Sequence, residues 1–228
     1  MSFIMPSRRS TTNLLQASGE LWSEDAEQAP LQFVVLAPGS STDPRVDAVL
    51  GAATQLAPDD IALHPVAVDD LPPFAGDLAD DGPVDAAVRR YRDDIALADG
   101  FLLIAAADDA HAQELLLRAV RWAGTPAGED ALADLPVVWL GIGGDPEVTA
   151  GVRLRVRAAV EAGGGVMVDE VAALAAPLTG DWSERIGPGG RLDDVTTRQA
   201  VGQVLMRLRQ SAFSGEGDVP AGDDETDG

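Results

Sequence analysis

Five short apolar runs alternate along this chain with segments whose apolar residues recur at helical spacing. Runs rich in Val, Ile and Leu, without polar alternation, are typical of strands buried on both faces. Strands that alternate with helices form a parallel sheet covered by helices on both sides. The expected strands are residues 31–37, 61–68, 101–107, 135–143 and 165–171.

The order of the five strands follows from the connections. Right-handed crossovers leave few topologies, and Pro65 favours an edge position for the second strand because proline cannot donate to the sheet. We therefore predict an α/β fold: a flavodoxin-like three-layer sandwich with a five-stranded parallel sheet in the order 2-1-3-4-5. In this order the topological switch point, where ligands bind, lies between strands 1 and 3. The loops at that edge are residues 38–45, 107–111 and 141–145.

The helical segments are defined by their apolar stripes, with one more helix expected over residues 112–124. The inward positions are expected to be Val46, Val49, Leu50, Ala53 and Leu56; then Val88, Tyr91, Ile95 and Leu97 in 84–98; then Val148, Val152, Leu154, Val156 and Val160 in 147–162; and last Val195, Val201, Val204, Leu205 and Leu208 in 193–210.

The chain divides into three parts. Residues 1–30 form an N-terminal extension, in which Thr12–Trp22 has the pattern of a short helix with Leu14 and Leu15 available for docking. Residues 31–210 form the flavodoxin-like domain. Residues 211–228 carry acids and no base, so we expect a disordered acidic tail.

Composition excludes several classes of function. The net charge of −22 repels nucleic acid and anionic membrane surfaces, so neither is an expected partner. No apolar run approaches the roughly 20 residues of a membrane helix, and no secretory signal is recognised, so we expect a cytoplasmic protein. Cysteine and lysine are absent. Disulfides, thiolate nucleophiles, Schiff bases and a P-loop are therefore excluded.

The first loop, with sequence PGSSTDPR (38–45), has two interpretations. It resembles a phosphate cradle, in which Gly39, Ser40 and Thr42 present donors at a helix N-terminus and Arg45 adds a guanidinium fork. It is equally compatible with a helix cap made by a serine or Asp43, followed by proline in the first turn.

These features together resemble the NADPH-dependent FMN reductase family, over roughly residues 31–210. The family's phosphate motif G-S-x-R-x-x-S-x-N is matched at Gly39 and Ser40, while Thr42 replaces its arginine. DDLPPF (69–74) is similar to the family's D-L-P loop, and GRLDDVTTRQAV (190–201) to its segment before the last helix. The resemblance implies FMN and NAD(P)H as cofactors, bound at the switch point.

The flavin-ring loop departs from the family pattern P-E-Y-N-x-S-x-P-G-x-L-K-N-A-x-D-W. Aligned on Trp122, the helix half is retained, but Asp108 replaces the tyrosine and Asp109 the asparagine. With Ala107 and Ala110, these residues would line the flavin without an aromatic platform. The third loop offers Gly143 and Gly144, which permit close backbone approach.

Other sites are poorly supported. The pattern D-x-H-x-x-E at 109–114 lies after the wrong strand for a cobalamin site and lacks its glycine. His111 has no second histidine nearby for a metal. No Ser/His/Asp triad is indicated, and we assign no catalytic or metal-binding residue.

Two hypotheses of function remain. The chain is either an NAD(P)H-dependent FMN reductase whose FMN binding is weakened by the altered loop, or a non-catalytic interaction or regulatory module that has lost flavin. We also expect a homodimer through helix 112–124, because Leu117 stands where the family has a lysine and the resemblance implies an interface there. A further protein partner is left unidentified.

Overall fold

The computed structural model describes residues 29–74, 85–124, 131–168 and 175–214. Five parallel strands form one sheet in the order β2-β1-β3-β4-β5, as predicted, with β2 at an edge. The strands are β1 Leu31–Leu36, β2 Ile61–Pro65, β3 Gly100–Ala106, β4 Pro136–Ile142 and β5 Val166–Met167.

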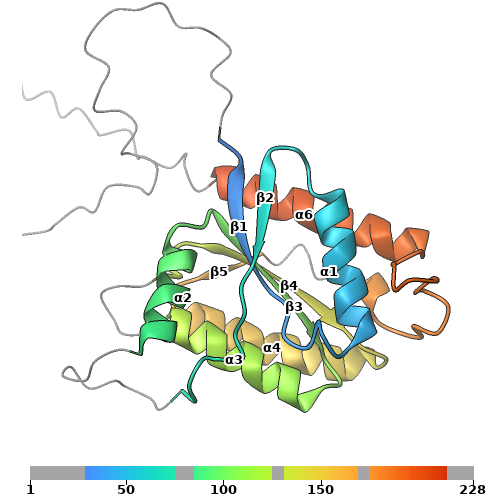
Figure 1. Cartoon of the computed structure of the whole chain (residues 1–228), viewed down its shortest axis with the longest axis horizontal. Helices are drawn as coiled ribbons and strands as arrows, with labels where there is room; N and C mark the ends of the chain where they lie inside the picture. The colour runs from blue at the N-terminus through green and yellow to red at the C-terminus, as the bar shows by residue number, and fades with distance from the viewer. Residues whose placement is uncertain (1–28, 75–84, 125–130, 169–174, 215–228) are drawn as a thin grey trace, which may run out of the picture.

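Helices cover both faces of the sheet (Figure 1). One face carries α1 and α6, and the other carries α2, α3 and α4. The helices are α1 Pro44–Leu56, α2 Ala86–Ala96, α3 Ala110–Ala123, α4 Pro146–Ala162 and α6 Val195–Ser214, with a 3-10 turn, η2, at Ala176–Leu178. None of the described helices is long and apolar enough to cross a membrane.

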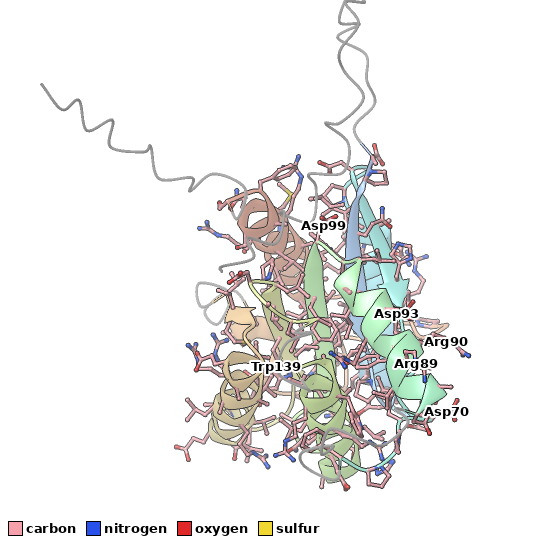
Figure 2. The ribbon with its side chains drawn as sticks, turned by 90° about the vertical axis from the view of Figure 1, so that its left-hand side faces the viewer. Asp70, Arg89, Arg90, Asp93, Asp99 and Trp139 are labelled. Atoms are coloured by element: carbon pink, nitrogen blue, oxygen red, sulfur yellow. The ribbon has the colours of Figure 1, made fainter. Side chains whose placement is uncertain are left out.

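The runs of β1, β3 and β4 were correctly interpreted as doubly buried strands, whereas the edge strands β2 and β5 are partly exposed. Every residue of β3 is buried, and successive residues of β1 alternate between the two cores. Trp139 of β4 lies beneath α3 and α4, whereas Arg89, Arg90 and Asp93 project outward from α2 (Figure 2).

Four predicted inward positions are wrong, because Leu97, Val148, Leu154 and Val195 are exposed. Leu97 follows the last turn of α2, and Val148 and Val195 belong to the first turns of α4 and α6. These helix ends extend beyond the part of each helix that packs against the core. Leu154 lies two positions from the buried Val152 and Val156, so helical geometry turns it to the opposite face.

Some boundaries also differ. β2 ends at Pro65, and α6 continues to Ser214, beyond the predicted domain end at 210. α3 begins at Ala110 because Asp109 caps it. The predicted helix at Thr12–Trp22, the end of the predicted strand 165–171, and residues 215–228 lie outside the described residues.

Candidate functional site at the switch point

The loops that follow β1, β3 and β4 meet at the carboxyl edge of the sheet, where β1 and β3 are direct neighbours. Each loop ends in an aspartate that caps the next helix. Asp43 accepts the backbone N–H of Arg45 at 2.8 Å, Asp109 that of His111 at 2.9 Å, and Asp145 that of Glu147 at 2.8 Å. The positive end of each helix dipole therefore already has a carboxylate from the chain.

Turn hydrogen bonds occupy most of the expected donors in the first loop. The N–H groups of Thr42 and Asp43 both bind the carbonyl of Gly39, at 2.9 and 2.7 Å, and that of Ser40 binds Ala37. The hydroxyl of Thr42 also donates to Gly39, at 3.2 Å. Gly39 has a φ of 84°, a conformation that favours glycine. Of the two interpretations, the cap is the one that the structure shows, with Asp43 as the capping residue.

Arg45 binds two carboxylates at once. Its Nη1 and Nη2 each donate to one oxygen of Asp108, both at 2.8 Å, and its Nη2 and Nε donate to Asp43 at 2.7 and 3.1 Å. We call this arrangement the Arg45 bridge: Arg45 with Asp43 and Asp108. It ties the first loop to the β3–α3 junction, and it uses the planar donor set that a phosphate would need.

The bridge changes the protonation equilibria of its members. The hydrogen bonds from Arg45 lower the pKa of Asp108, and the backbone N–H of Gly144 adds to this effect. Partial burial raises the pKa of Asp43, but its hydrogen bonds with Arg45 outweigh burial, so that pKa is also lowered. Hydrogen bonds with Asp108 and then Asp43 raise the pKa of Arg45. The bridge is therefore fully charged at neutral pH.

All three loops contribute to the surroundings of one carboxylate, that of Asp108. Arg45 comes from the first loop, and Gly144 from the third. The side chain of Asp108 is 45% exposed, so this carboxylate lies at the surface of the edge and not in its interior. An anion of the protein itself thus has the kind of partners that a bound anion would have.

The rest of the β3–α3 junction is fixed by internal bonds. The N–H of Ala107 donates to Ile142, and its carbonyl accepts from the buried side chain of Gln113 at 2.5 Å. Gln113 in turn accepts a hydrogen bond from Arg155 on α4. Ala110 is exposed at the start of α3. This Gln113–Arg155 link was not predicted from the sequence, because only the packing of α3 against α4 brings the two residues together.

The third loop is held by the segment around η2. The N–H of Gly143 donates to Leu178, and its carbonyl accepts from Gly180. A Cβ on Gly143 would lie 2.9 Å from the hydroxyl of Thr149, so packing alone explains this glycine. Gly144 has open space around its Cα, which leaves room for a ligand to approach.

The other residues shared with the family motifs have structural roles. Asp194 caps α6 through the N–H and hydroxyl of Thr197, and Arg198 donates to the carbonyl of Leu192. The D-L-P loop supports Trp122, whose indole N–H donates to Pro72 at 2.8 Å. These motifs therefore position elements of the fold.

Among the predicted site residues, the structure brings Arg45, Asp108 and Gly144 together, and places Gly39 beside the start of α3, where its Cβ would lie 3.8 Å from Ala112. Thr42 is exposed. Within the described part of the chain, no three His, Asp or Glu side chains form a potential metal site. The partnership of Asp43 with Arg45 was missed, although an aspartate two residues before an arginine at a helix start is a local signal for it.

No family model matches the chain, and no curated protein matches it in sequence. Solved structures do match. FerB, a flavoenzyme NAD(P)H:(acceptor) oxidoreductase from Paracoccus denitrificans, is 18% identical, with a TM-score of 0.64 over 82% of this chain and 99% of its own. The fold is flavodoxin-like. An oxidoreductase from Corynebacterium diphtheriae is 12% identical, with a TM-score of 0.53 over 81% of this chain and 98% of its own. The apo form of an NADH:FMN oxidoreductase, EMOB, is 17% identical, with a TM-score of 0.45 over 81% of this chain and 89% of its own.

Proposed function

We propose that this chain is a divergent protein of the NAD(P)H-dependent FMN reductase kind, with the flavin site at the switch-point edge and with weakened FMN binding. In such a protein the cofactor supplies the hydride chemistry, from NAD(P)H to a small acceptor, and the protein supplies binding and electrostatics. The fold shared with FerB, a flavoenzyme, supports the general kind of reaction. The Arg45 bridge is the single observation that supports the weakening.

The residues present do not fit a phosphate in the arrangement that the structure shows. Arg45 already donates to two carboxylates, and a phosphate would have to displace Asp108 or share Arg45 with it. The displaced carboxylate would then remain close to a dianion, and like charges at a partly desolvated site oppose each other. The same argument applies to the phosphates of NAD(P)H, so we derive no catalytic step through either cofactor.

A second candidate function is an interaction or regulatory module without flavin. One observation favours it: the carboxylate of Asp108 takes up the donors of Arg45 and is aided by the N–H of Gly144. The positive charge of Arg45 is therefore already balanced by carboxylates of the protein, with no cofactor needed.

Titration of FMN, followed by quenching of flavin fluorescence, tests the proposal. We expect a dissociation constant above about 1 μM for the unmodified protein. Asp108→Asn removes one charge and releases donors of Arg45, so we expect it to tighten FMN binding by roughly fivefold to tenfold. Asp94→Asn, at an exposed position of α2, removes the same charge away from the edge and should leave the affinity unchanged.

Oxidation of NAD(P)H with FMN added in excess separates the two candidates. Turnover that rises with FMN, and rises further in Asp108→Asn, supports the reductase. If Asp108→Asn shows neither FMN binding nor turnover, the result supports the second candidate, an interaction or regulatory module without flavin. Sub-micromolar FMN binding by the unmodified protein would show that the Arg45 bridge does not weaken the site.

A further inference from the structure

A groove runs along the outer side of α6. It has a volume of about 980 Å³. We call it the α6 groove; its lining residues are Leu56, Val195, Arg198, Gln199, Gly202, Gln203, Met206, Arg207 and Gln210. In a chain with 38 acidic residues, this lining holds two arginines and no carboxylate.

Two apolar residues of the α6 groove are exposed. Val195 is 65% exposed and Met206 41% exposed. Gly202, between them, has nothing within 4 Å of a Cβ position, so the middle of the groove is open. An exposed apolar stripe with a small residue at its centre is suited to a packed helix.

The start of the described chain lies at one end of this groove. The N–H of Leu31, at the beginning of β1, donates to the carbonyl of Asp60. The carboxylate of Asp60 accepts a hydrogen bond from Arg209 of α6 at 2.7 Å. The segment before β1 therefore joins the domain beside the last turns of α6, and Figure 1 shows the start of β1 close to one end of that helix.

The N-terminal segment offers an apolar side and acids, which complement the apolar residues and the arginines of the α6 groove. Its apolar residues Leu14, Leu15, Leu21 and Trp22 fall on one side of a helix, because they are spaced by one, seven and eight positions. The acids that follow the start of this stripe are Glu20, Glu24, Asp25 and Glu27, complementary to the arginines of the groove.

The lengths agree as well. A helix over Thr12–Trp22 would be roughly 16 Å long, and the groove from Val195 to Gln210 spans roughly 22 Å of α6. The residues between 22 and 30 can extend over roughly 25 Å, enough to lead back along α6.

We propose that the segment Thr12–Trp22 docks as an amphipathic helix in the α6 groove of its own chain. Docking covers Val195 and Met206. It also brings Glu20 of the segment, and the acids Glu24, Asp25 and Glu27 that follow it, toward Arg198 and Arg207.

Cross-linking tests the proposal, because the natural chain has no cysteine. We expect the pair Leu15→Cys with Gln203→Cys to form an intramolecular disulfide at least about tenfold faster than the pair Leu15→Cys with Leu154→Cys. Leu154 is a matched control, since it is 66% exposed on α4 and outside the groove. Equal rates for the two pairs, or a product that links two chains, would overturn the proposal.

Hydrogen exchange of the full chain gives an independent measurement. We expect the amides of residues 14–22 to exchange at least about tenfold more slowly in the unmodified protein than in Met206→Asp, which places a charge in the groove without changing the core. Leu154→Asp should leave that protection intact. Unprotected amides in the unmodified protein, or protection that survives Met206→Asp, would contradict the docking.

Discussion

Arg45 can hold Asp43 and Asp108 together because its guanidinium is planar and offers donors along two edges. A lysine could not make both bidentate contacts. The bridge is partly exposed, with 24% of the Arg45 side chain accessible, so solvent screens it. Its main effect is therefore on the chemistry of the edge, since it fixes where the positive and negative charges lie.

The bridge makes stability depend on pH. The pKa values of Asp43 and Asp108 are lowered in the folded protein, so their contribution is complete above the unfolded value near about 4 and is lost as the pH falls through the folded values. We expect Asp108→Asn to lower the free energy of unfolding by about 0.5–1 kcal/mol at pH 7. The difference from the unmodified protein should shrink below about pH 4.

Urea unfolding at several pH values between 3 and 7 measures this effect. Asp94→Asn is again the control, because Asp94 is exposed on α2. A difference between Asp108→Asn and the unmodified protein that stays constant over this range would show that the charge of Asp108 is not what stabilises the loop.

Helices α3 and α4 approach each other closely where both end. Gly124 and Gly163 follow their last turns, and each donates its N–H back into its own helix. A Cβ on Gly124 would lie 2.5 Å from the Cα of Gly163, a distance that no side-chain rotation can relieve. The two glycines thus set how closely the helices converge over the core around Leu132, which lies 3.1 Å from a Cβ on Gly163.

We expect Gly124→Ala to lower the free energy of unfolding by about 1–3 kcal/mol, because the backbone of α4 must move. Gly151→Ala is the matched control: Gly151 lies inside α4 with open space around it, and alanine there should stabilise the helix by about 0.5–1 kcal/mol. Chemical unfolding of both variants measures the contrast. Equal effects of the same sign would show that the helix ends can separate without cost.

The last turn of α6 belongs to the domain. Ala212 packs against the core, and the ring of Phe213 lies 5.2 Å from the guanidinium of Arg209. We expect a chain that ends at Ser214 to melt at nearly the temperature of the full chain. A chain that ends at Gln210 should have a free energy of unfolding lower by about 0.5–1 kcal/mol, because it lacks the cation–π contact between Arg209 and Phe213. Calorimetry of the two truncations decides, and identical melting of both would leave residues 211–214 without a stabilising role.

At the scale of the whole molecule, charge opposes association while the surface of α3 favours it. Leu117 is half-buried against the core, and it lines a hollow of about 500 Å³ between α3 and α4, together with Phe74 and Arg121. Most of α3 is thus buried in its own domain, and this hollow is a place where a partner could cover part of the rest. The net charge of −22 repels a second copy.

We propose a homodimer through the α3–α4 hollow that is tighter at high ionic strength, because salt screens the repulsion between two acidic chains. Sedimentation velocity at two salt concentrations tests it. Leu117→Asp should weaken the dimer at both, whereas Leu154→Asp, on the exposed side of α4, should not. A monomer at both salt concentrations, at tens of micromolar protein, would remove the interface and leave Leu117 as a residue of the core.

The sequence by itself determined the sheet. Apart from Gln32 in β1, the runs of β1, β3 and β4 are apolar, and only a strand covered on both faces can bury such a run. The proline in β2 correctly predicted the edge, and strand order then followed from the handedness of crossovers. Positions at the ends of helices, such as Leu97 and Val195, were predicted wrongly, because periodicity does not indicate where a helix leaves the core.

Only the tertiary structure decided what the switch-point residues contact. Arg45 and Asp108 are 63 positions apart, and the sequence fixes neither their distance nor their orientation. Parallel strands bring their carboxyl ends to one edge, so the sequence predicted which loops meet there. Whether an arginine in such a loop awaits a phosphate or already binds a carboxylate depends on side-chain geometry between loops, which local patterns do not encode.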